Sequence, residues 1–189
     1  MPKTSSLALD IEAAHHRIRV TSLWLRCICL ACTLLVVAGN ASFWIMVTPT
    51  SDWLPAEVIG KVGQDNLTLP VRAGGFVIGM IPASAMIWGL LALASLFRSY
   101  ADGNYFSPVT VASFRHLGFA ALFGCIAQTL YGAMVTPLVT FGNPPGERFV
   151  TISIGTVNVG LLLLGFALIV VSWVMEEARK IEDEQRQFV

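Results

Sequence analysis

Cysteine and histidine are the residue types in this chain that could bind a metal or carry redox chemistry. Three thiols stand close together, at Cys27, Cys29 and Cys32, and a fourth lies far along the chain at Cys125. Thiolates are preferred ligands of zinc. On a helix, at about 100° per residue, Cys29 points roughly 200° and Cys32 roughly 140° away from Cys27. Thiols that diverge in this way do not converge on one ion, so we expect packing roles and no metal site.

The histidines show no catalytic arrangement either. His15 and His16 are adjacent and diverge on a helix, and His116 stands at the expected inner end of an apolar segment. The sequence contains no nucleophile–base–orienter grouping, phosphate-binding glycine loop or pair with metal-ligand spacing. We therefore expect no enzymatic activity, no catalytic residues and no cofactor.

Four uncharged stretches dominate the chain, and the shortest holds 25 residues. A helix needs about 20 apolar residues to cross the hydrocarbon core of a bilayer. Runs such as the four leucines at 161–164 do not alternate as barrel strands do. Hydrophobic residues make up 55% of the chain and charged residues 13%, roughly half the charged fraction of about 25% in soluble domains. The sequence predicts an all-α integral membrane protein with four transmembrane helices.

The chain of 189 residues has room for a single membrane domain and no separate soluble one. We expect spans at 23–47, 74–98, 117–141 and 151–175, an external loop at 48–73, a cytoplasmic loop at 99–116 and a cytoplasmic tail at 176–189. The tail should continue the last helix. Apolar residues recur at helical spacing before the first span, which predicts an amphipathic N-terminal helix on the membrane surface; they are Leu7, Ile11, Ala14 and Ile18.

Basic residues predict the orientation. Nine lie in the segments on the side of the N-terminus and three on the opposite side, which places both termini in the cytoplasm. The formal net charge is zero, so we expect no direct binding of nucleic acid. The nine are Lys3, Arg17, Arg19, Arg26, Arg98, Arg115, Arg179, Lys180 and Arg186, and the three are Lys61, Arg72 and Arg148.

No Asp, Glu, Lys or Arg lies within the four uncharged stretches, and Arg26 and Arg98 stand at the cytoplasmic ends of the first two predicted spans, which counts against ion coupling. Asn40, Gln128 and Asn158 do lie within these stretches, and interhelical hydrogen bonding is the interpretation we favour for them. Gln128 stands in a stripe of small residues spaced by four, so its amide should bond across a close helix contact. The alternative is a polar ligand site lined by the same three side chains. The stripe is Ala120, Gly124, Gln128, Gly132 and Thr136, and small pairs recur at Gly75 with Gly79 and at Thr156 with Gly160.

The segment between the second and third spans carries turn chemistry. Asp102, Gly103 and Asn104 predict the end of a helix, with a positive φ at Gly103. Ser107 and Pro108 predict the start of the next one, with Ser107 as N-cap. We expect the Phe106 ring to tuck against the inner end of the bundle. On the last helix we expect ion pairs of Glu176 with Lys180 and of Glu182 with Arg186.

Several blocks around this turn resemble an uncharacterised bacterial membrane family, domain of unknown function 2975 (DUF2975). They are residues 96–100, 103–108 and 114–118, together with the charged helix at 176–185, and the resemblance covers roughly residues 20–189. It implies a multi-pass protein of the bacterial inner membrane with no assigned reaction. It also implies an association with a small helix-turn-helix transcription factor. The ending Gln187-Phe188-Val189 departs from the apolar finish of the family.

Two functions follow from these observations. The first is a non-enzymatic membrane protein whose cytoplasmic face binds, and sequesters, a small cytoplasmic regulator. The second is a transporter-like or sensor bundle that binds a small apolar ligand between the second and third spans, where Pro82 and Pro137 can kink the helices. Self-association into a homo-oligomer is left open. The candidate partner surface is Gly103, Phe106, Ser107, Arg115, Arg179 and Lys180.

Overall fold

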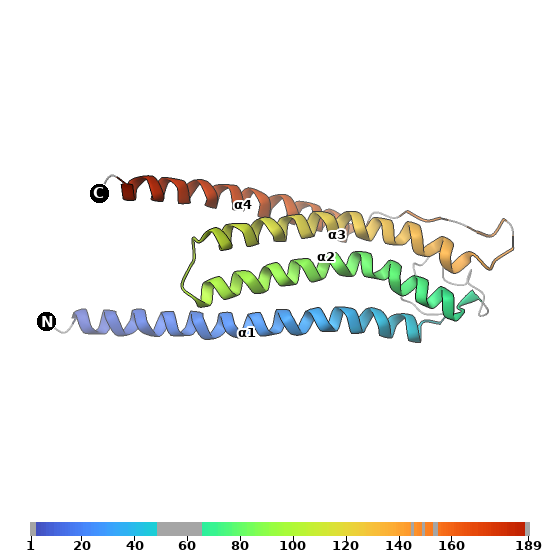
Figure 1. Cartoon of the computed structure of the whole chain (residues 1–189), viewed down its shortest axis with the longest axis horizontal. Coiled ribbons are helices and arrows are strands. Elements are labelled where there is room, and N and C mark those ends of the chain that lie inside the picture. The colour runs from blue at the N-terminus through green and yellow to red at the C-terminus, as the bar shows by residue number, and fades with distance from the viewer. Residues whose placement is uncertain (1–2, 49–65, 145, 149, 153–154, 188–189) are drawn as a thin grey trace.

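Four long helices form the described part of the protein, shown as a computed structural model in Figure 1. It describes residues 3–48, 66–144, 146–148, 150–152 and 155–187, and these contain no strand. The helices lie side by side in an antiparallel arrangement, and each packs mainly against its neighbours in the chain. Both termini and the turn between the second and third helices lie at one end (Figure 1). The helices are α1 (Lys3–Met46), α2 (Leu69–Ala101), α3 (Pro108–Thr140) and α4 (Thr156–Gln187).

All four helices contain a segment long and apolar enough to span a membrane: Arg17–Met46, Leu69–Ala101, Pro108–Thr140 and Thr156–Ile181. Many of their large apolar side chains face outward; Leu34 and Leu35, for example, are 74% and 67% exposed. Such a surface is solvated by lipid tails, while the helices satisfy their own backbone polar groups. The prediction of an all-α multi-pass membrane protein with four transmembrane helices is confirmed.

The helix boundaries differ from the expected spans in three places. The predicted N-terminal helix and first span form one uninterrupted helix, α1. α2 begins at Leu69 rather than near residue 74, with Pro70 in its first turn, where proline needs no N–H partner. α4 begins at Thr156 rather than near residue 151. The reason is visible at Thr151, whose N–H donates to Thr136 Oγ1 at 3.1 Å and ties this segment to the end of α3. Residues 49–65 of the expected external loop lie outside the described residues.

α1 and α2 meet through small residues on α2. The indole ring of Trp44 lies against Gly75, where a Cβ atom would overlap it. One turn away, Gly79 leaves room for the Asn40 side chain, whose Nδ2 donates to the Phe76 carbonyl at 3.1 Å. Trp44 is 2% exposed and belongs to the apolar core at this end of the protein. The other core residues are Val47, Leu67, Val135 and Val139.

Arg72 joins the end of α1 to the start of α2. Its Nη1 donates to the carbonyls of Trp44 at 2.9 Å and Ile45 at 2.6 Å, and its Nε donates to the Leu67 carbonyl at 3.1 Å. The last carbonyls of a helix have no partners within it, and a cation there also complements the helix dipole. Arg72 therefore caps α1 from the neighbouring helix.

α3 and α4 pack closely at Gly118 and Gly165. A Cβ atom on either glycine would lie 2.9–3.0 Å from the backbone carbonyl oxygen of the other. The small pair predicted on α4, Thr156 with Gly160, does not serve this purpose, since both residues are exposed and a Cβ on Gly160 would meet nothing within 4 Å. α2 and α3 continue as helices through Pro82 and Pro137.

Candidate functional site

The turn between α2 and α3 has the predicted backbone geometry. Gly103 has φ +76°, in the left-handed region that favours glycine. Its N–H donates to the Tyr100 carbonyl at 3.1 Å, and the N–H of Asn104 donates to the Ser99 carbonyl at 2.9 Å. These bonds satisfy carbonyls that the last turn of a helix leaves open. The prediction that α2 ends at a glycine with positive φ is confirmed.

Three hydroxyls meet beneath this turn, and we call Ser99, Ser107 and Thr110 the hydroxyl cluster. Ser99 Oγ lies 2.9 Å from both Ser107 Oγ and Thr110 Oγ1, and the latter two oxygens are 3.1 Å apart. Ser99 and Thr110 also contact the Asn104 carbonyl oxygen, each at 2.9 Å. Ser107 Oγ accepts a hydrogen bond from the Thr110 N–H at 3.2 Å, so the predicted N-cap is confirmed. The cluster fixes both helix ends and the turn between them.

Phe106 does not tuck against the end of the bundle, so that prediction is wrong. Its side chain is 61% exposed. The space below the turn holds the hydroxyl cluster, with Thr110 fully buried, so polar side chains rather than apolar ones lie there. Val109, on the first turn of α3, is also exposed. The turn thus presents two apolar side chains on a backbone fixed by hydrogen bonds.

The basic residues of the candidate surface differ in their exposure and in the ion pairs that they form. The Arg115 side chain is exposed and makes no hydrogen bond or ion pair to the described part of the chain, and the same is true of the Arg98 side chain. Arg179 is half-buried. Lys180 forms an ion pair at 3.3 Å with Glu177 rather than the expected one with Glu176, and both partners are largely exposed. A pair this exposed contributes little to stability.

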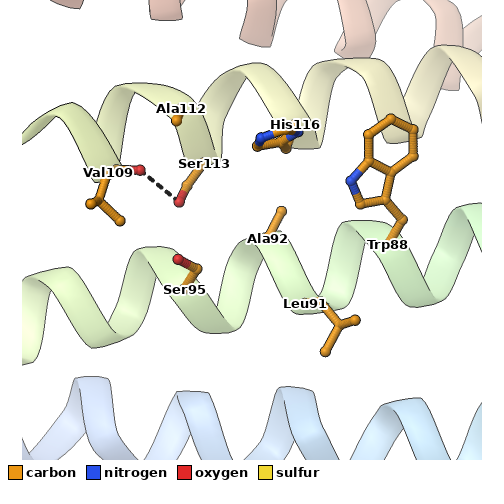
Figure 2. Close-up of a pocket in the computed structure, with 8 residues that line it drawn as sticks. All are labelled: Trp88, Leu91, Ala92, Ser95, Val109, Ala112, Ser113 and His116. Atoms are coloured by element: carbon orange, nitrogen blue, oxygen red, sulfur yellow. Dashed lines mark hydrogen bonds between the residues drawn. The ribbon is translucent and has the colours of Figure 1, made fainter.

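A groove of about 390 Å³ opens between α2 and α3, beginning next to the turn (Figure 2). Its mouth lies between Ser95 and Val109, and its far end lies between the rings of Trp88 and His116, whose centroids are 6.0 Å apart. Its volume falls within the range of ligand pockets, about 300–1,000 Å³. The remaining lining residues are Leu91, Ala92, Ala112 and Ser113.

An apolar ligand site between the second and third spans was one of the two predicted functions, but the residues that line this groove were not predicted, although a signal for them exists. Ser95 and Trp88 are separated by seven residues on α2, and Val109 and His116 by seven on α3. Seven residues are about two helical turns, so each pair shares a face. A short turn at 102–107 makes the two helices antiparallel neighbours, which sets the two faces opposite each other.

The three polar residues within the spans do not share a site. Asn40 bonds to α2, as described above, and Asn158 Nδ2 donates to Thr129 Oγ1 at 3.2 Å, which links α4 to α3. Gln128 is exposed and makes no hydrogen bond to the described residues, so the expected bond across its stripe is not formed. The structure therefore brings none of the three together into a common ligand site.

The cysteines are likewise dispersed. Cys29 is buried, Cys27 is exposed, and Cys32 and Cys125 are intermediate. Among the described residues, no group of three or more His, Cys, Asp or Glu side chains could hold a metal ion.

The chain matches the profile of a family described as "Protein of unknown function (DUF2975)" over residues 58–188. The matched part contains α2, the turn with its hydroxyl cluster, α3 and α4. No curated protein and no solved structure matches the chain. The family match covers more than half of the 189 residues and includes the segments whose resemblance was noted from the sequence. This chain therefore belongs to the DUF2975 family.

Proposed function

We propose that this chain is a non-enzymatic protein of the bacterial inner membrane that binds a soluble cytoplasmic protein at the α2–α3 turn. The observation that carries the proposal is the 61% exposure of Phe106 on a turn fixed by the hydroxyl cluster. Aromatic anchors dominate the binding energy of many protein interfaces. A turn that is already ordered loses little conformational entropy when a partner binds.

Charge and helix placement support the same surface. Arg115 and Lys180 are exposed basic residues, and α4 returns to the end of the protein that bears the turn (Figure 1). Gly103 and Ser107 shape the backbone of this docking surface, whereas Phe106, Arg115 and Lys180 are the side chains that contact a partner. Basic residues at its edge favour an acidic patch on that partner.

The proposal requires the α2–α3 turn to face the cytoplasm. The asymmetry of nine basic residues to three supports this orientation of the protein. Reporter fusions inserted at Asp102 and Gly146 test it. We expect the fusion at Asp102 to report the cytoplasm and the fusion at Gly146 the outside. The reverse result would place the docking surface outside the cell and exclude a cytoplasmic partner.

Family resemblance suggests a small helix-turn-helix transcription factor as the partner. A photo-crosslinking amino acid at Phe106 in the full-length protein, in its native membrane, tests this directly. We expect a cross-link to one small DNA-binding protein and none from the same probe at Phe141. Phe141 is a matched control, because it is 69% exposed and lies at the opposite end of α3.

Variants separate docking from folding. Phe106→Ser should abolish the cross-link to the partner, measured in this variant with the photo-crosslinking amino acid at a neighbouring position. It should also change transcription of the genes that the partner controls. Phe141→Ser should do neither. If Arg115→Glu combined with charge reversal at Arg179 and Lys180 alters neither partner recovery nor transcription, the docking proposal fails.

A second candidate function is the binding of a small apolar ligand between α2 and α3. The groove of Figure 2 favours it, because four of its eight lining side chains are aliphatic and the Ser113 hydroxyl is already bonded to the Val109 carbonyl. The other polar groups in its lining are Ser95, His116 and the indole N–H of Trp88. Binding of a ligand there can be measured independently of any soluble partner.

A further inference from the structure

The groove between α2 and α3 extends from the charged end of α2 into its uncharged stretch. From Ser95 to Trp88 it runs about 10 Å along α2, at about 1.5 Å per residue. The headgroup zone is about 5–8 Å deep on each side of the hydrocarbon core. Arg98, one turn beyond Ser95, is the first charged residue after the uncharged stretch of α2. An occupant of the whole groove is therefore polar at one end and apolar at the other.

The side chains that line the groove suit an occupant that is polar at one end and apolar at the other. Ala92 and Ala112 leave the middle of the groove open, and the Trp88 and His116 rings close its far end at a tilt of 54° (Figure 2). The Ser113 hydroxyl donates to the Val109 carbonyl at 2.8 Å, so it offers no free proton to a ligand. The stretch of the groove along Ala92 and Ala112 thus suits a hydrocarbon chain, which ends against the Trp88 and His116 rings.

Two cations flank the groove without partners of their own. Arg98 follows Ser95 by three residues in the direction of the turn. Arg115 follows Ala112 by three residues away from the turn, and its side chain inclines back toward the N-terminal, turn-side end of α3. Both guanidinium groups are exposed, and neither forms an ion pair or hydrogen bond within the described residues. Guanidinium groups bind phosphate in a bidentate manner.

We infer that this groove binds one anionic glycerophospholipid from the leaflet next to the α2–α3 turn. The phosphate lies by Arg98 and Arg115, and one acyl chain follows Ala92 and Ala112 to the Trp88–His116 pair. The inference rests on the second candidate function and names its ligand as an amphiphile with an anionic head. It shares Arg115 with the docking surface and uses none of the other docking residues.

Native mass spectrometry of the purified full-length protein tests the inference, with phosphatidylglycerol and phosphatidylcholine of identical acyl chains as probes. We expect preferential retention of phosphatidylglycerol. Arg98→Gln with Arg115→Gln should lower that retention by about fivefold per arginine removed. The matched control is Arg17→Gln with Arg19→Gln, which removes the same charge from two exposed arginines of α1 and should leave retention unchanged. Equal retention of both lipids, or an equal loss in the control, would overturn the inference.

A second variant tests the acyl chain. Ala112→Trp fills the groove and should lower retention of both lipids, whereas Ala167→Trp, at an exposed position of α4, should not. The thermal unfolding midpoint of each variant shows whether it is folded. If phosphatidylglycerol is not retained but 1-decanol is, and Ala112→Trp abolishes that binding, the lipid inference is overturned and the second candidate function stands. If neither is retained, both fail.

Discussion

Gly118 on α3 and Gly165 on α4 lie backbone against backbone. A Cβ atom on Gly118 would lie 2.9 Å from the Gly165 carbonyl oxygen, and one on Gly165 would lie 3.0 Å from the Gly118 carbonyl oxygen. In a membrane, where lipid tails are as apolar as the helices, close approach of this kind is a main source of helix association. The α3–α4 contact therefore depends on the absence of two side chains.

Gly118→Ala should weaken this contact, because the added Cβ would meet Gly165 backbone and the Ile169 side chain, the latter at 2.6 Å. We expect a loss of about 1–3 kcal/mol in the free energy of unfolding, the usual effect of overpacking. Unfolding in mixed micelles measures it. Gly160→Ala is the control, since its Cβ would meet nothing within 4 Å. Equal unfolding free energies for the two variants would contradict the assigned role of Gly118.

The sequence did not reveal which face of each span contacts protein. A membrane helix is apolar on its lipid-facing and protein-facing sides alike, so hydrophobic periodicity carries little information there. For this reason Gln128 and Gly160 were expected at interfaces and are exposed, while Gly118 and Gly165 were not singled out.

The turn was predicted more accurately because its signals are local. Gly103 and Ser107 follow from backbone geometry and capping, which act within a few residues. Phe106 was the exception, because its position depends on the hydroxyl cluster, and that cluster forms only when α2 and α3 are paired.

Replacement by leucine should affect the free energy of unfolding differently at Gln128 and at Asn158. Asn158→Leu removes the bond to Thr129 and should lower the free energy of unfolding by about 0.6–2 kcal/mol. Gln128→Leu removes an exposed amide from a lipid-facing position, so stability should be unchanged or higher. Unfolding in mixed micelles distinguishes the two. Destabilisation by Gln128→Leu equal to that by Asn158→Leu would show that the amide has a partner in the membrane, such as a second copy of the chain.

Gly103 offers a test of the turn. Gly103→Val forces a β-branched residue into φ +76° and should destabilise the protein by about 1–3 kcal/mol. Gly103→Asn should cost less, because asparagine tolerates the left-handed region. The amount of folded protein in the membrane and its thermal midpoint measure both. A Cβ at Gly103 would meet nothing within 4 Å, so a clash of that atom with a neighbour does not account for the loss of stability. Equal effects of the two substitutions would mean that backbone conformation is not the cause.

Arg72 should govern the order of the last turn of α1. Arg72→Lys keeps the charge but loses the planar fork that reaches the carbonyls of Trp44, Ile45 and Leu67. Hydrogen bonds to a charged group contribute about 1.5–3 kcal/mol each when buried and less at an interface. We therefore expect α1 to fray at its end, and the Val47 N–H, which donates to the Phe43 carbonyl at 2.8 Å, to exchange with deuterium faster.

Arg115→Lys is the matched control for this experiment, because Arg115 makes no hydrogen bond to the described residues and lies near the other end of the molecule. It should leave exchange at Val47 unchanged. The Arg72 guanidinium joins the end of another helix, so we expect that the charge kept in Arg72→Lys does not replace the lost fork. Unaltered exchange at Val47 in Arg72→Lys would show that charge alone caps α1, through the helix dipole rather than through the contacts to the Trp44 and Ile45 carbonyls.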